Sequence, residues 1–149
     1  MPALTAAGAG FLCAVLWFDL MFDVQARGAG EPSAEALASI STYYRRVTTE
    51  AAPMGRLISL IMLVTLVSTA AEVVRVGGWW TWSSLAGTLF ATGLAVTRTV
   101  PAARRLGQAA DPVETRVRLA RALLRDHLVF LAVMALVLAL QLARAAGGI

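Results

Sequence analysis

The sequence predicts an all-α integral membrane protein, a four-helix bundle that uses the whole chain, residues 1–149, as one transmembrane domain. Hydrophobic residues make up 58% of the chain. Charged residues make up only 15%, compared with about 25% in ordinary soluble domains. Four apolar stretches are long enough to cross a hydrocarbon core, which needs about 20 helical residues. These stretches are Leu4–Phe22, Leu57–Val76, Trp79–Val100 and Leu128–Ala145.

All 13 basic residues are arginines, and their positions follow membrane topology rather than a nucleic-acid-binding surface. Most lie in two segments, Arg27–Arg56 and Arg98–Arg125, which follow the first and third apolar stretches. Because arginine is enriched in cytoplasmic loops, we expect both segments inside and both termini outside, in a bacterial inner membrane. The uncharged N-terminus lacks the basic region of a cleaved signal peptide, so we interpret Leu4–Phe22 as a retained span.

An amphipathic cytoplasmic helix is predicted between the first two spans, over Pro32–Glu50. Ser33 is placed to cap it, and Pro53 fits the first turn of the second span, where a missing N–H costs nothing. The apolar residues of the predicted helix recur at helical spacing, so they form one stripe that faces the membrane or the mouth of the bundle. The stripe consists of Leu37, Ile40, Tyr44 and Val47.

The second half of the chain predicts an antiparallel helix pair and then a long helix. The turn Val76–Trp79 is short, and the tryptophans around it mark the outer membrane interface. The third span is expected to end at Val100–Pro101. In the segment Asp111–Glu114, the aspartate is expected to cap a helix, with proline in its first turn. No breaker follows until Gly147, so this helix should run about 34 residues, through the fourth span.

An acidic pair inside the first span is the strongest pointer to a site. Asp19 and Asp23 are four residues apart and so share one helix face. A charge within a span costs roughly 2.5–3.5 kcal/mol on insertion scales, so both should face the bundle interior. The predicted topology brings Arg98, Asp126 and His127 to the same depth. His127, the only histidine, is the natural general base, with Asp19 or Asp23 as its partner on another helix.

Several of these residues also have a purely structural interpretation. Asp126 is expected to be solvated at the membrane edge, and Arg98 is expected to neutralise Asp19 or Asp23. Tyr43 and Tyr44 either anchor the loop helix at the interface or contact a ligand. Glu72, near the outer face, is expected to pair with Arg75, three residues further along the helix.

The candidate site has four catalytic and four substrate-binding residues. The catalytic candidates are His127, Asp19, Asp23 and Arg98, and the substrate-binding candidates are Tyr43, Tyr44, Arg45 and Trp17. Two carboxylates and one histidine also suit iron, manganese or zinc in type, so Asp19, Asp23 and His127 are the candidate metal ligands. The cofactor is thus either none or a single metal ion.

Two short segments resemble a known family. The end of the third span, TRTVPAARRLG (Thr97–Gly107), and the start of the fourth, RLARALLRDHLVF (Arg118–Phe130), are similar to the anthrone oxygenase-like family of small four-span membrane proteins. That family shows a Val-Pro followed by polar and basic residues, and an Asn-His at the start of the last helix. The residues that fit are Val100, Pro101, Arg104 and His127; the chain departs from the pattern at Ala103, at Asp126 and in its acidic pair.

The resemblance implies an oxidoreductase that inserts oxygen into a phenolic or anthrone-type ring, with no cofactor or a single metal. In that reading His127 is the base, Asp19 or Asp23 orients it, and Arg98 holds the oxyanion. Two other functions remain open from the residues alone. One is a non-catalytic subunit of a homo-oligomer or larger membrane complex, and the other is a small transporter whose path is lined by the acidic pair.

Overall fold

The computed structural model describes residues 2–28 and 30–147, and within them every regular element is helical, with no strand. The all-α prediction is therefore confirmed. Three helices are long and apolar enough to cross a membrane: Pro2–Ala26, Pro53–Arg75 and Val113–Ala145. Their length and composition make the chain an integral membrane protein.

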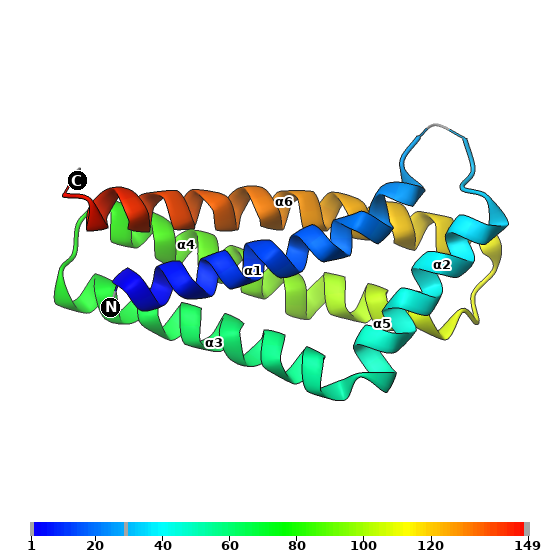
Figure 1. Cartoon of the computed structure of the whole chain (residues 1–149), viewed down its shortest axis with the longest axis horizontal. Helices are drawn as coiled ribbons and strands as arrows, with labels where there is room; N and C mark the ends of the chain where they lie inside the picture. Colours follow the sequence, from blue (N-terminus) through cyan, green and yellow to red (C-terminus); the bar gives the residue numbers. More distant parts are fainter. Residues whose placement is uncertain (1, 29, 148–149) are drawn as a thin grey trace.

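Four long helices run side by side and form the body of the molecule (Figure 1). α1 (Pro2–Asp23) packs against α6 (Val113–Ala145) and α3 (Ala52–Arg75), and α4 (Trp79–Leu94) packs against the same two helices. The start of α1, the end of α6 and the turn between α3 and α4 all lie at one end of the bundle (Figure 1). We call this the terminal end, and the opposite end, which carries the two shorter helices, the loop-helix end.

The two shorter helices close the loop-helix end. α2 (Ala34–Arg45) packs against α5 (Val100–Gln108). A 3₁₀ turn, η1 (Val24–Ala26), precedes the loop to α2, and a π turn, η2 (Arg46–Glu50), follows α2. α2 is the predicted amphipathic helix: the Ser33 Oγ accepts a hydrogen bond from the Ala36 N–H at 3.1 Å. Three of the four predicted stripe residues are buried, namely Leu37, Ile40 and Tyr44.

α3 contacts the bundle unevenly along its length. None of its residues from 53 to 64 is buried, whereas Thr65, Ser68, Thr69 and Glu72 are. α1 and α3 approach closely in the terminal half, where a Cβ on Gly8 would collide with the Thr65 side chain. Towards the loop-helix end the two helices diverge (Figure 1). The first half of α3 is therefore less tightly packed than the second, although Ile58, Ile61 and Met62 still contact the hydrophobic core.

The helix after the α3–α4 turn runs further than predicted. It does not end at Val100–Pro101, because α4 continues through a π turn, η3 (Ala95–Thr99), into α5, which ends at Gln108. Pro101 lies in the first turn of α5. A proline is tolerated there because the π turn before it already interrupts the regular hydrogen-bond ladder.

The start of α6 also differs from the prediction, although its length of 33 residues is close to the expected one. Asp111 does not cap the helix. Its carboxylate instead accepts two hydrogen bonds from Arg105, each 2.7 Å long. This bidentate pair lowers the pKa of Asp111 below its ordinary value. The Arg105 guanidinium gives Asp111 two hydrogen-bond donors in one plane, whereas capping the helix would give it one backbone N–H donor.

The buried polar residues of the terminal end form a separate cluster. The predicted Glu72–Arg75 pair is wrong: Glu72 accepts hydrogen bonds from Thr5 Oγ1 at 2.8 Å and from Arg144 Nη1 at 3.0 Å. Arg75 is exposed on the outer surface of α3. Glu72 faces the interior, where Thr5 of α1 and Arg144 of α6 reach it, so it pairs with these residues rather than with Arg75.

Candidate functional site

A buried histidine–carboxylate pair forms the centre of the loop-helix end. His127 Nδ1, from α6, lies 2.6 Å from Asp23 Oδ2, at the end of α1. Asp23 is completely buried, and its other oxygen accepts a hydrogen bond from the Tyr44 hydroxyl at 2.6 Å. Because a carboxylate only accepts hydrogen bonds, Nδ1 carries the proton and donates it to Asp23. The unprotonated nitrogen of the neutral ring is then Nε2.

The second carboxylate of the acidic pair faces the other side of the imidazole. Asp19 Oδ2 lies 4.0 Å from His127 Nε2, and Asp19 Oδ1 accepts a hydrogen bond from the Tyr43 hydroxyl at 2.5 Å. The Tyr43 ring is stacked on Phe22, with ring centroids 4.1 Å apart. The four-residue spacing in α1 thus places one carboxylate at each ring nitrogen of His127, as the shared helix face predicts.

The two tyrosines act as fixed donors from α2. Burial raises the pKa of the Tyr43 and Tyr44 phenols, and the nearby carboxylates of Asp19 and Asp23 raise it further. Both hydroxyls therefore stay protonated and hold the carboxylates in place. Tyr44 is itself fixed because Leu37, Ile40 and Tyr44 share the buried stripe of α2.

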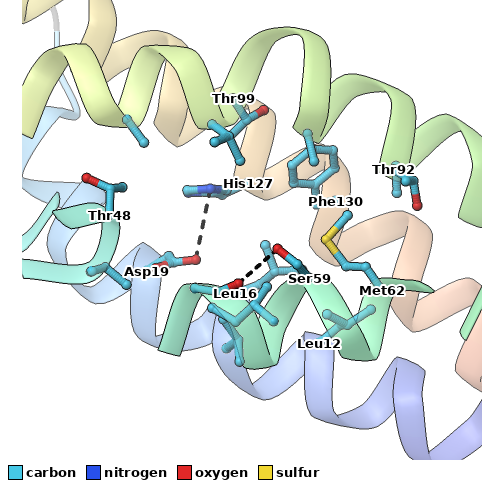
Figure 2. A pocket seen from close by; sticks show the side chains of 18 of the residues that line it. Leu12, Leu16, Asp19, Thr48, Ser59, Met62, Thr92, Thr99, His127 and Phe130 are labelled. Carbon is cyan, nitrogen blue, oxygen red and sulfur yellow. Dashed lines mark hydrogen bonds and ion pairs between the residues drawn. The ribbon is translucent and has the colours of Figure 1, made fainter. Parts of the chain in front are cut away.

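The site opens into a cavity of about 530 Å³ within the bundle. Figure 2 shows Asp19 and His127 facing each other across it, with Thr48 on one side and Phe130, Met62 and Leu12 further along. Its polar lining is concentrated at the loop-helix end, where Tyr44, Arg56, Thr99 and Arg104 also reach it. The remaining walls are mainly apolar, and they include Leu16, Ala91, Ala95 and Met134.

Arg98 and Asp126 lie outside this cavity and pair with each other. Arg98 Nε is 3.4 Å from Asp126 Oδ2, so the expected pairing of Arg98 with Asp19 or Asp23 is wrong. Asp126 was expected to be solvated, but it is only 4% exposed and also lies 3.4 Å from Thr99 Oγ1. Adjacent residues on a helix point about 100° apart, which directs Asp126 to η3 and His127 to α1.

Two of the four predicted substrate-binding residues face away from the cavity. Trp17 is 64% exposed on the outer surface of α1, and Arg45 is exposed and pairs with Glu50 at 3.2 Å. Tyr43 reaches Asp19 but does not line the cavity wall. Tyr44 is the one member of the set that does.

The lining residues that sequence reasoning missed come from every element around the cavity, and those on α3 and α5 include its two arginines. Arg56 was not singled out, and Arg104 entered only through the family resemblance. Neither forms a hydrogen bond or ion pair within the part of the chain that the structure describes. One signal was available in α3, because Gly55, Ile58, Ser59 and Met62 recur at helical spacing and mark one face.

The metal-site hypothesis finds no support in this geometry. Among residues 2–28 and 30–147, no group of three or more His, Cys, Asp and Glu side chains is placed to hold an ion. His127 Nδ1 is already engaged by Asp23. The two carboxylates lie on opposite ring nitrogens rather than around one shared point.

Comparisons of the chain with protein-family models, with curated proteins and with solved structures find no match. The function must therefore be argued from the site itself.

Proposed function

We propose that the chain is a four-span membrane protein with both termini outside a bacterial inner membrane, and that its cavity binds an apolar phenolic or anthrone-type substrate. His127 removes a proton from this substrate, which then reacts with oxygen, so that the protein is an oxygenase-like oxidoreductase. One observation carries the proposal: the ring of His127 lines an apolar cavity while its Nδ1 is held by a buried carboxylate. The resemblance of Val100, Pro101, Arg104 and His127 to the anthrone oxygenase-like family supplies the reaction class.

The remaining span in this proposal is α4 with η3. These two elements follow each other without a break from Trp79 to Thr99. This is about the length that a membrane span needs. The arginine-rich segments then all lie at the loop-helix end, which favours that end as the cytoplasmic one.

The proposed base works through its two carboxylate neighbours. Asp23 fixes the imidazole in the tautomer whose Nε2 is free to accept a proton, and it stabilises the imidazolium that forms. Asp19, 4.0 Å from Nε2, adds to that stabilisation. Asp23 is a positioning residue in this scheme, since it is completely buried behind the ring.

The overall reaction is balanced by molecular oxygen as the oxidant. Loss of a proton from the ring CH₂ group of an anthrone leaves a carbanion delocalised as a phenolate. Oxygen adds to that carbon, one oxygen atom becomes the new carbonyl, and the other leaves as water with the two hydrogens. Arg56 and Arg104 line the cavity, so they replace Arg98 as the positive charges available to the oxyanion.

The test replaces His127 with alanine in the full chain, purified in detergent and supplied with anthrone and oxygen. We expect the rate of oxygen consumption to fall about 10²- to 10⁴-fold, the contribution of one general base. Asp111→Asn is the control, because Asp111 pairs with Arg105 outside the cavity. This variant should retain full activity. Wild-type turnover in a folded His127→Ala protein would disprove the role of the histidine.

A non-catalytic subunit is the second candidate function, and the outer surface of α1 is where a partner would bind. Trp17, Phe18 and Met21 are each more than half exposed and lie on neighbouring turns. Lipid covers such a surface as well as a protein does. Stoichiometric co-purification of another chain in mild detergent, lost in a Trp17→Ala, Phe18→Ala variant, would support this function over the enzyme.

A further inference from the structure

The cavity is bounded on one side by the first half of α3, which contacts the core only through partly buried residues such as Ile58, Ile61 and Met62. Residues 53–64 include no buried position, although they belong to a candidate span. Their inward side is formed by Gly55, Ile58, Ser59 and Met62, which line the cavity. Their outward side carries exposed leucines, Leu57, Leu60 and Leu63. The cavity is therefore separated from the surrounding lipid by one loosely packed helix.

The polarity of the cavity changes along its length. Arg56, at the start of α3, and Arg104, on α5, lie at the loop-helix end. Neither has an acidic partner within the described residues. Asp19 is the acidic residue in the lining, and the Tyr43 hydroxyl and His127 already face its two oxygens. The opposite part, around Met62, Phe130 and Met134, is mainly apolar and carries no charged residue; its polar groups are the hydroxyls of Thr88 and Thr92, and Thr88 donates its hydroxyl to the Ser84 carbonyl.

This arrangement matches the two ends of an amphiphile. Two exposed guanidiniums in the lining at one end of a cavity attract an acidic group, and an apolar pocket takes a hydrocarbon or ring body. The volume of about 530 Å³ is in the range of sites for one small molecule. An amphiphile with a large apolar body partitions into the bilayer, so the surrounding lipid is its main source.

We propose that the ligand is a membrane-dissolved amphiphile with one apolar body and one carboxylate group, and that it reaches the cavity sideways from the lipid past the first half of α3. The carboxylate lies between Arg56 and Arg104, and the apolar body extends past His127 towards Met62 and Met134. The inference deepens the proposed function and rests on it in one respect, because both take this cavity as the ligand site. It does not depend on His127 acting as a base.

The experiment uses the full chain in nanodiscs of phosphatidylcholine. The probes are spin-labelled palmitate and the matching spin-labelled hexadecanol, which differ only in the charged head. The measured quantity is the fraction of probe whose spectrum shows immobilisation by the protein. We expect palmitate to bind about ten-fold more tightly than the alcohol, a difference that corresponds to about 1.4 kcal/mol.

Two pairs of variants test the two ends of the ligand. Arg56→Gln with Arg104→Gln should reduce palmitate binding to the level of hexadecanol, whereas Arg105→Gln, next to Arg104 but outside the cavity, should change nothing. Met62→Trp should fill the cavity and abolish binding of both probes. Leu63→Trp adds the same ring on the lipid side of α3, and its binding should remain that of the wild type.

Each outcome has a distinct meaning. Equal binding of palmitate and hexadecanol by the wild type, or equal behaviour of Met62→Trp and Leu63→Trp, would overturn the inference. If neither probe binds while His127-dependent turnover of anthrone persists, the amphiphile is wrong and the proposed function stands. If palmitate binds as expected but no His127-dependent turnover occurs, the oxygenase function is wrong and the ligand class stands.

Discussion

Asp23 is buried without any exposure, and its two hydrogen-bond donors explain how a carboxylate is held there. His127 Nδ1 and the Tyr44 hydroxyl each bind one of its oxygens, at 2.6 Å. A buried carboxylate without partners would be strongly destabilising, so the three side chains form one unit. Since His127 is on α6 and Tyr44 on α2, this unit also connects α1, α2 and α6.

The ionisation of the two phenols can be measured directly by absorbance, because Tyr43 and Tyr44 are the only tyrosines of the chain. Burial and the adjacent carboxylates raise the pKa of both phenols above the ordinary value of about 10. The folded chain therefore keeps protons above pH ~10 that the unfolded chain releases. The stabilisation is complete below pH ~10 and is lost as the pH rises from there through the folded-state pKa.

We expect almost no tyrosinate absorbance from the folded protein near pH 10, and about half of the full absorbance from the denatured chain at the same pH, which is the ordinary midpoint of tyrosine. Tyr43→Phe leaves Tyr44 as the only chromophore of this kind and should show the same delay. A folded Tyr43→Phe protein that titrates with an ordinary midpoint would contradict the buried position of Tyr44.

The meeting of His127 with Asp19 and Asp23 was predictable from the sequence, but the exclusion of Arg98 and several hydrogen-bond partners were not. Helical rise fixes the depth of each residue along the bundle, so His127 could be placed level with Asp19 and Asp23. The rotation of each helix about its axis decides which side chain faces which neighbour. That rotation is set by helix packing. It brings Asp126 into an ion pair with Arg98, and Glu72 into an ion pair with Arg144.

At the scale of elements, the contact between α2 and α5 positions the two tyrosines. A Cβ on Gly107 would lie 2.7 Å from the Arg45 backbone nitrogen and 2.9 Å from the Tyr44 carbonyl carbon. Backbone atoms cannot move aside as a flexible side chain can. Only a residue without a side chain allows α2 to lie this close to α5, and α2 carries Tyr43 and Tyr44 to the carboxylates.

Gly107→Ala is therefore expected to lower the free energy of unfolding by about 1–3 kcal/mol, because the added carbon overfills a tight contact. Thermal unfolding in detergent measures the change. Gly93→Ala is the matched control, since a Cβ there meets no atom within 4 Å, and it should raise stability by about 0.5–1 kcal/mol. Equal stability of the two variants would show that α2 and α5 are not in close contact.

The hydropathy of α3 predicts a span, but it does not predict that the first half of that span is only loosely packed. The separation depends on where α1 and α3 touch, at Gly8 and Thr65, and on the direction each helix takes from that contact. Hydrophobic side chains pack equally well against lipid and against protein. The composition of a helix therefore does not distinguish a packed face from a cavity wall.

At the scale of the whole molecule, the proposed topology predicts which loops are accessible from outside the cell. We expect single cysteines at Glu31 and Gln108, in a Cys13→Ala background, to resist a membrane-impermeant maleimide in intact cells. A cysteine at Val76, in the exposed turn between α3 and α4, should react. The physical reason is the concentration of arginines at the loop-helix end. Labelling of Glu31→Cys together with protection of Val76→Cys would reverse the topology.

The sequence alone determined that this chain is helical and embedded in a membrane, and it set the depth of each ionisable residue. Hydropathy and the rise of 1.5 Å per residue act along a single helix, so one dimension can be predicted from local pattern. The tertiary structure decided the rest: the position of His127 between two carboxylates, the placement of Arg98 outside the site, and the cavity beside α3. These depend on how helices rotate and separate, which is set by contacts between residues far apart in the chain.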